Sequence, residues 1–347
     1  MAGVQEPSVV VRAAARERRW SSDYIAGSDA GKRLPINAFL GLVRQGHSFY
    51  RSPARFVRLF WAFSTNLGHQ FEIFRILALP AFASLVRLDP IFPFKYLTRG
   101  YLVRGLAPAE RAASFAHHYR RLNAIFPRPL LQKILYRDII LVEKQIDERL
   151  LSVHLNLARK EVREGELTFT LRLDGTAIYI LQCTIVPGKV VQSNASDVIL
   201  VSRLQGMKGS YKQVQLATKA FSEVAPPALL LAVLHGFAQI AGIDEMAGIA
   251  AASQFSYLPE YDDSFRAAYD NFWIELGAKK ITASFYASPI PPQDKSLDAI
   301  TNGHKSRTRK KRALKQQIAE HVVRLLRKPD TNPSFIAVPS SSSLPQE

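Results

Sequence analysis

The sequence is poor in cysteine and in acidic residues, and both shortages exclude classes of protein. Cys183 is the single cysteine among 347 residues, which excludes internal disulfides and zinc sites built from thiolates. It lies in a strand-like run, so we interpret it as a core residue and not as a nucleophile. Twenty-nine acidic residues stand against 46 lysines and arginines. The resulting net charge of +17 predicts an anionic partner, such as a phosphate-bearing small molecule, lipid or nucleic acid.

The sequence also lacks the segments that mark membrane-spanning and secreted proteins and several enzymes. The longest weakly polar stretch near the start, residues 76–86, is too short to cross a bilayer. The first twenty residues are charged and contain no apolar segment of the secretory type. No Ser-His-Asp elbow, P-loop or HExxH motif occurs. We therefore expect a cytoplasmic protein that its basic charge can bring to the inner membrane.

Apolar residues make up 47% of the chain, enough for a large core. We expect a basic disordered tail over residues 1–34 and a helical region rich in arginine and aromatic residues over residues 35–150. One helix begins at Pro108 and stops at Pro127, and a second runs from Pro129 to Ile139. His117 and His118 are adjacent and point about 100° apart on the first of these helices, so they do not form a metal-ligand pair, and no metal is predicted.

The segment 53–63 carries an apolar helical face beside arginines. Its members are Phe56, Leu59, Phe60 and Phe63. Two interpretations fit this pattern: an interfacial amphipathic helix, and a helix packed against its own domain. We favour the second interpretation, because helices with this pattern more often pack against their own domain.

From residue 151 to residue 292 the pattern changes to that of a mixed α/β domain. Apolar residues alternate, and Asp174-Gly175 predicts a hairpin turn. The expected strands are Ser152–Ala158, Glu166–Asp174, Ala177–Val186, Asp197–Leu204, Met246–Ala252 and Ile281–Tyr286. Helices are expected after Gly209, over Ala228–Ala241 and over Asp262–Leu276. A strand, a glycine turn, two helices and a strand make the crossover that a parallel strand pair requires.

The end of the chain is strongly basic. Residues 293–328 are predicted to be a linker and a basic helix, and residues 329–347 a disordered tail. Eleven lysines and arginines in residues 295–328 stand against two acidic residues, a local charge of +9. An apolar stripe predicts that the helix docks on the domain; it consists of Leu314, Ile318, Val322 and Leu325.

Five segments in this order resemble the VirK/YbjX family of bacterial proteins. They are Leu204-Gln205-Gly206, Thr218-Lys219, Pro226–Leu234, Tyr269–Trp273 with Glu275-Leu276-Gly277, and the helix start Lys305–Arg312. The resemblance covers about residues 108–325 and implies a role in virulence, envelope remodelling or tolerance of antimicrobial peptides. Where family members read Gly-Leu-Arg-Pro, this chain has Glu223-Val224-Ala225-Pro226, so no role that needs an arginine at that turn is carried over.

The expected α+β order of elements also looks like the GNAT acyltransferase fold. There, backbone amides after a central strand hold the pyrophosphate of coenzyme A at a helix start. The segment Arg203–Gly209 resembles that turn with one extra residue. The residues predicted to bind an acyl-CoA-type donor are Arg203, Gln205, Gly206, Lys208, Gly209, Thr218 and Lys219. The alternative phosphate turn, Ala225–Ala228, precedes the longer helix but has no glycine.

An acyltransferase must deprotonate an amine or hydroxyl acceptor. The candidate bases are Glu245, Asp270 and His235, although we favour a core histidine for His235 because its helix is apolar. The alternative function is a non-catalytic protein bound to an anionic membrane surface or to RNA. Lipid ranks above nucleic acid because the strand aromatics Phe169, Tyr179 and Phe285 are interpreted as core residues.

Overall fold

The computed structural model describes residues 57–327 except residues 58, 59, 62, 90, 91, 99, 159–163, 295 and 297–301. The predicted disordered tails at both ends therefore lie outside the described residues. So do the start of the predicted helical region and most of the predicted linker.

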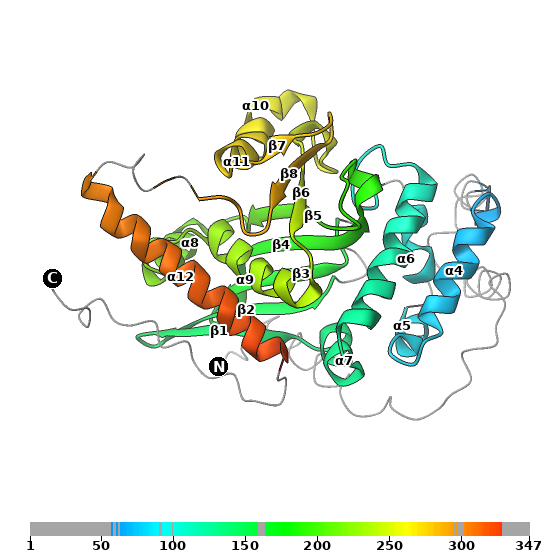
Figure 1. Ribbon diagram of the computed structural model, residues 1–347, viewed down its shortest axis with the longest axis horizontal. Coiled ribbons are helices and arrows are strands. Elements are labelled where there is room, and N and C mark those ends of the chain that lie inside the picture. The colour runs from blue at the N-terminus through cyan, green and yellow to red at the C-terminus, as the bar shows by residue number, and fades with distance from the viewer. Residues whose placement is uncertain are drawn as a thin grey trace, which may run out of the picture.

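One sheet of eight strands forms the centre of the molecule, with helices on its flank and across its face (Figure 1). The strands are β1 (Ile139–Ile146), β2 (Arg149–Leu157), β3 (Leu167–Leu173), β4 (Thr176–Pro187), β5 (Asp197–Gly206), β6 (Glu245–Ile249), β7 (Lys279–Lys280) and β8 (Phe285–Pro289). Their order in the sheet is β1-β2-β3-β4-β5-β6-β8-β7. Neighbours are antiparallel except β5 and β6. This parallel pair confirms the predicted crossover and the mixed α/β class.

Helices precede, connect and follow the strands. They are α4 (Leu67–Leu77), α5 (Ala83–Leu88), α6 (Pro108–Ile125), α7 (Arg128–Tyr136), α8 (Tyr211–Ala220), α9 (Pro226–Ala241), α10 (Asp262–Phe265), a π-helical turn (Arg266–Asp270), α11 (Asn271–Glu275) and α12 (Asn302–Arg327). Short 3₁₀ turns span Phe92–Leu97, Gly188–Val191, Ala251–Ser253 and Pro259–Tyr261. The helix predicted over Asp262–Leu276 is thus confirmed, with one π turn inside it.

The basic C-terminal helix α12 docks across α9, as its apolar stripe predicted (Figure 1). Leu314, Ile318, Val322 and Leu326 are buried, while Leu325 is half-buried. Close approach of the two helices depends on Gly236, because a Cβ atom there would lie 2.5 Å from the carbonyl oxygen of Ala319. One hydrophobic core joins α12, the sheet and the N-terminal helices from Phe63 onward.

Two predictions at element level were wrong. The second N-terminal helix ends at Tyr136, and residues 139–146 form the edge strand β1, where Ile139, Ile140 and Val142 favour extended backbone. The predicted last strand is two strands, β7 and β8, with a bend between them. The two interpretations of segment 53–63 both stay open: Phe63 is buried against Phe94 at 6.0 Å, and Phe60 is exposed. Phe56 and Leu59 lie outside the described residues.

The turn at Ser222 and Glu223 contains one of the departures from the VirK/YbjX pattern. Glu223 stands where that pattern has glycine, and its φ of 64° lies in the left-handed region that glycine adopts without strain. Its carboxylate pairs with Arg307 of α12 at 3.2 Å. The chain therefore has an ion pair to the C-terminal helix at a position where glycine would relax the backbone.

Candidate functional site

The parallel strands β5 and β6 run side by side for only part of their length. Their pairing covers three residues of each strand, from Ile199 opposite Met246 to Val201 opposite Gly248. Beyond this point, Ala250 donates its N–H to Ser284 on the β8 side, at 2.8 Å. Strand β5 continues to Gly206, which is about 16 Å of strand at 3.3 Å per residue. An irregular register opposite Gln182–Cys183 places a bulge where the separation begins.

A cluster of polar side chains lines the end of β5, and we call it the β5 cluster: Glu164, Tyr179, Arg203, Gln205 and Tyr269. Arg203 pairs with Glu164 through Nη1 at 3.2 Å and donates from Nε to Gln205 Oε1 at 3.0 Å. Tyr269 comes from the π turn that follows β6, and it interacts electrostatically with Glu164 and with Tyr179. The cluster therefore combines residues from the end of β5 with a residue from the segment that follows β6.

Burial sets the protonation of the β5 cluster. Burial raises the pKa of Glu164 above its ordinary value, although Arg203 opposes the shift. Burial and the nearby carboxylate raise the pKa of Tyr269, and burial raises the pKa of Tyr179 to about 12. At neutral pH both phenols keep their protons, and the carboxylate binds a proton more readily than an exposed glutamate does. The cluster thus holds one proton acceptor and two donors.

The turn after β5 leads directly from this cluster into α8. Gly206 ends the strand opposite Tyr179, and a Cβ atom on it would touch that ring at 3.4 Å. Lys208 is exposed, and Gly209 has a φ of 81°. The N-cap, Ser210, makes no side-chain cap hydrogen bond, so the first amides of α8 have neither an intrahelical nor a capping partner. Of the predicted donor-binding residues, five lie together here: Arg203, Gln205, Gly206, Lys208 and Gly209.

The other two predicted donor-binding residues lie away from this turn. Thr218 donates to Val214 O at 2.8 Å inside α8, and Lys219 is exposed at the far end of that helix. At 1.5 Å per residue, Lys219 is about 12 Å along the axis from the first residue of α8. The alternative phosphate turn, Ala225–Ala228, includes Pro226 and Pro227, and these prolines remove two of the amides that an anion would need.

The structure does not gather the three candidate bases at the β5 cluster. Glu245 begins β6 at the opposite end of the parallel pair, level with Val198 and about 26 Å of strand from Gly206. Asp270 accepts the backbone N–H of Ala251 at 2.8 Å and so fixes the chain just after β6. His235 is buried, its Nε2 lies 2.8 Å from the Gln239 amide nitrogen, and burial lowers its pKa.

The sequence analysis did not single out Glu164, Tyr179 and Tyr269 as candidate site residues. Tyr179 was assigned to the core with Phe169 and Phe285, which are indeed buried, but Tyr179 is half-buried beside Gly206. Tyr269 was visible only as part of a family motif. Glu164 lies in a charged loop before β3, and only the pairing of β3 with β4 brings it to Arg203.

Two other polar clusters hold elements together. At the start of β5, Asp197 accepts from His117 at 2.6 Å and from Arg121 at 3.1 Å, which ties α6 to the sheet. Burial lowers the pKa of His117, with its Asp197 partner opposing the shift. The neighbouring His118 is fully buried, and its Nδ1 accepts the backbone N–H of Ile185.

The third cluster resembles a catalytic triad only in composition. Ser152 Oγ lies 2.8 Å from His154 Nε2, but His154 Nδ1 lies 3.7 Å from Asp138, beyond hydrogen-bond distance. Arg172 and Asn156 hold the Asp138 carboxylate at 2.7 and 2.5 Å instead. Ser152 is buried in the middle of β2. This cluster therefore pins β1, β2 and β3 together.

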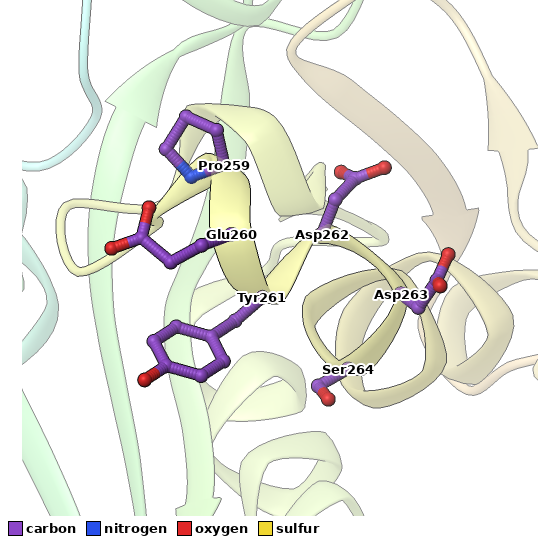
Figure 2. A pocket seen from close by; sticks show the side chains of 6 residues that line it. All are labelled: Pro259, Glu260, Tyr261, Asp262, Asp263 and Ser264. Atoms are coloured by element: carbon purple, nitrogen blue, oxygen red, sulfur yellow. The ribbon is translucent and has the colours of Figure 1, made fainter.

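A shallow hollow of about 260 Å³ lies on the turn that enters α10 (Figure 2). Its lining is one continuous segment, Pro259–Ser264, whose side chains point away from one another (Figure 2). Without convergent groups from a second element, it is a surface irregularity and not a binding site. In the described ranges, histidine, cysteine and carboxylate residues form no group of three that could hold a metal ion.

None of the helices in the described part of the chain is both long and apolar enough to span a membrane. Comparison with curated proteins and with solved structures gave no match. Residues 53–324 match a family of proteins of unknown function, DUF535. This range contains the N-terminal helices, the whole sheet and most of α12. The chain therefore belongs to the DUF535 family.

Proposed function

We propose that the protein is an acyltransferase of GNAT-like design, which takes an acyl-CoA-type donor at the turn Gly206–Gly209. The observation that carries the proposal is the continuation of β5 beyond the end of its parallel partner β6, beside the β5 cluster. This part of β5 leads to a strand-to-helix turn with unpartnered amides and an exposed lysine. These are the properties of an anion site next to groups that can move protons.

The topology supports the same proposal. Strand β8 lies between β6 and β7, and the crossover from β5 to β6 passes through α8 and α9. The bulge in β5 agrees with the GNAT-like arrangement, in which a strand ends at a bulge before the donor-binding turn. The helix start of α8 provides amides and a dipole that favour a pyrophosphate.

The residues of the cluster divide into binding and proton-transfer roles. The bound donor supplies an activated thioester. Lys208 and the first amides of α8 face its phosphates, and Gly206 leaves room for its approach beside Tyr179. Glu164 takes up the proton that an acceptor amine or hydroxyl loses, and the Tyr269 hydroxyl holds a proton for the departing sulfur. Arg203 positions the Glu164 carboxylate.

We further infer that the chain is VirK/YbjX-like within DUF535, and that its acceptor belongs to the cell envelope. The order of the five quoted segments supports this assignment. Of these segments, Leu204-Gln205-Gly206 and Tyr269–Trp273 contribute to the β5 cluster and its turn. Two segments of the family pattern therefore meet at the candidate site.

Thermal unfolding with coenzyme A or acetyl-CoA tests the donor site. A ligand at 100 times its dissociation constant stabilises the native state by about 2.7 kcal/mol, which raises Tm by several degrees. We expect Gly206→Val to abolish this shift, because the added methyl groups meet the Tyr179 ring. Lys208→Ala should weaken binding, while Lys219→Ala, at the other end of α8, serves as the matched control. No shift in the wild-type protein, or equal loss in both lysine variants, would contradict the site.

A further inference from the structure

The segments leading into and forming α4 expose apolar side chains to solvent. Val57 and Trp61 are 64% and 71% exposed, and they lie one helical turn apart. Leu67 and Phe71 repeat this spacing on α4, at 36% and 47% exposure. We call these four residues the aromatic surface. The inward face of α4 is complete without them, because Ile73, Ile76 and Leu77 are buried in the core. The exposed residues are therefore surplus to the packing of the helix.

The C-terminal helix shows what an outward helical face looks like elsewhere in the molecule. Helix α12 buries its apolar stripe on α9 and exposes Arg309, Lys310, Gln316, Gln317 and Glu320. Single exposed apolar residues are normal, but two pairs at helical spacing within fifteen residues mark a contact surface. Because the solvent-facing side of α12 is polar and that of the aromatic surface is apolar, we infer that the aromatic surface contacts a partner.

The charge of the surrounding chain identifies the chemistry of that partner. Residues 29–72 contain six lysines and arginines and two acidic residues, Asp29 and Glu72, of which Glu72 is paired with Arg120 of α6. On α4, Arg75 is exposed one turn beyond Phe71, which extends the ridge of Leu67 and Phe71 with a cation. The partner must therefore accept apolar side chains and carry negative charge. A second copy of this chain, with its net charge of +17, does not meet the second requirement.

We propose that the aromatic surface docks on an anionic phospholipid bilayer. Tryptophan and phenylalanine favour the boundary between headgroups and acyl chains, and neighbouring arginines favour lipid phosphates. The aliphatic members Val57 and Leu67 fit acyl chains and offer nothing to a stacked base, which places lipid above RNA. The inference is independent of the proposed acyl transfer, because the aromatic surface shares no residue with the β5 cluster or the α8 turn.

Sedimentation of the full-length protein with vesicles tests the proposal. We expect binding to vesicles of phosphatidylcholine with a quarter phosphatidylglycerol, and at least tenfold weaker binding to phosphatidylcholine alone. The double variant Trp61→Ser/Phe71→Ser should bind anionic vesicles at least tenfold more weakly, and Arg75→Glu several-fold more weakly. The matched control is Ile274→Ser, since Ile274 is 59% exposed on α11. Unchanged Tm values would show that all variants fold.

Tryptophan fluorescence gives a second readout. The chain has tryptophans at positions 20, 61 and 273, and Trp273 is buried, so the measurement uses a Trp20→Phe background. In that background anionic vesicles should shift the emission to the blue, and adding Trp61→Phe should leave the emission nearly unchanged. The proposal fails if wild-type protein stays in the supernatant, or if the double variant sediments like the wild type. Release by Lys310→Gln/Lys311→Gln alone would make α12 the anchor instead. Loss of self-association or of RNA binding in the double variant, with vesicle binding intact, would likewise overturn it.

Discussion

Glu164 and Glu166 stand two residues apart on the segment that enters β3, yet their surroundings differ in every respect. Glu166 is fully buried, pairs with Lys95 at 3.0 Å and accepts a hydrogen bond from Tyr119. Its backbone N–H donates to Thr184 Oγ1. Glu164 is half-buried and has one charged partner, Arg203, at the open end of β5. We infer that the sealed carboxylate serves stability, and we propose that the open one takes part in chemistry.

The sealed network joins three parts of the chain that are far apart in sequence. Lys95 comes from the 3₁₀ turn Phe92–Leu97, Tyr119 from α6, and Glu166 from the start of β3. Lys95 also donates to Gly165 O at 3.2 Å. Removing one member would leave a charge without its partner in a dry environment, which is costly. The open cluster can lose a member at little structural cost because water reaches it.

The largest expected effect is therefore on stability, at Glu166. Glu166→Ala should lower the free energy of unfolding by roughly 3–5 kcal/mol, because it leaves the Lys95 ammonium buried without a counter-ion. Urea denaturation measures the change. The double variant Glu166→Ala/Lys95→Met should recover much of it. A loss below about 1 kcal/mol in the single variant would show that the buried pair contributes little.

At Glu164 we expect the opposite pattern. Glu164→Gln keeps the shape of the side chain but cannot accept a proton, so acyl transfer should fall by roughly 10²–10⁴-fold. Stability should change by about 0.5 kcal/mol or less, as for other open sites. The assay is thiol release from acetyl-CoA with a panel of amine and alcohol acceptors. Activity of the wild type should also fall as the pH drops through the raised pKa of Glu164. Full activity in the variant would remove Glu164 from the mechanism.

The pH dependence of stability sharpens the contrast, because buried His118 borders the sealed network. Burial lowers its pKa to about 3, with Lys95 adding to the shift. Below its ordinary pKa of about 6.5, the unfolded chain takes up a proton that the folded chain refuses, so stability falls as pH falls. This histidine should contribute about 1.4 kcal/mol per pH unit over that range. Unfolding at pH 7, 6 and 5 should show a shallower slope in His118→Asn, and equal slopes would contradict the assignment.

The smallest effect is expected at Glu223, outside both clusters. Glu223→Gly should remove about 1 kcal/mol of strain from a left-handed backbone conformation. A smaller entropy cost opposes this gain, because glycine is more flexible in the unfolded chain. The lost pair with Arg307 is largely exposed on both sides and contributes little. We expect a gain of about 0.5 kcal/mol in unfolding free energy. Glu223→Gln, which breaks the pair and keeps the strain, is the control; a marked loss of stability in both variants would show that the ion pair outweighs the backbone strain.

Local patterns made most elements predictable. The α6 helix begins and ends at the prolines that bound it, and the crossover followed from a strand, a glycine turn and two helices. Asp174 and Gly175 adopt the positive φ values that their hairpin turn requires. Strand β1 was missed because its short apolar run continues the periodicity of α7. Such runs distinguish strand from helix only through their neighbours in the sheet.

The site was less predictable because it depends on register. The five residues near Gly206 are close in sequence and were found together. Glu245 lies away from the β5 cluster because the register of β5 with β6 puts it at the far end of the pair. Nothing in sequence distance reveals that Glu164 faces Arg203, since their contact requires β3 and β4 to pair first. Polar residues in a loop directly before a strand, such as Glu164, are therefore candidates for a site that forms only when the strands pair.

Hydrogen–deuterium exchange of the full-length protein, with and without acetyl-CoA, tests the central claim most directly. The donor should slow amide exchange over residues 206–213, where the turn and the first turn of α8 provide the binding amides. Exchange in α12 should not change. Protection over residues 225–229 instead, at the start of α9, would move the donor to the other turn. No protection at either turn at saturating ligand would contradict an acyl-CoA site in this protein.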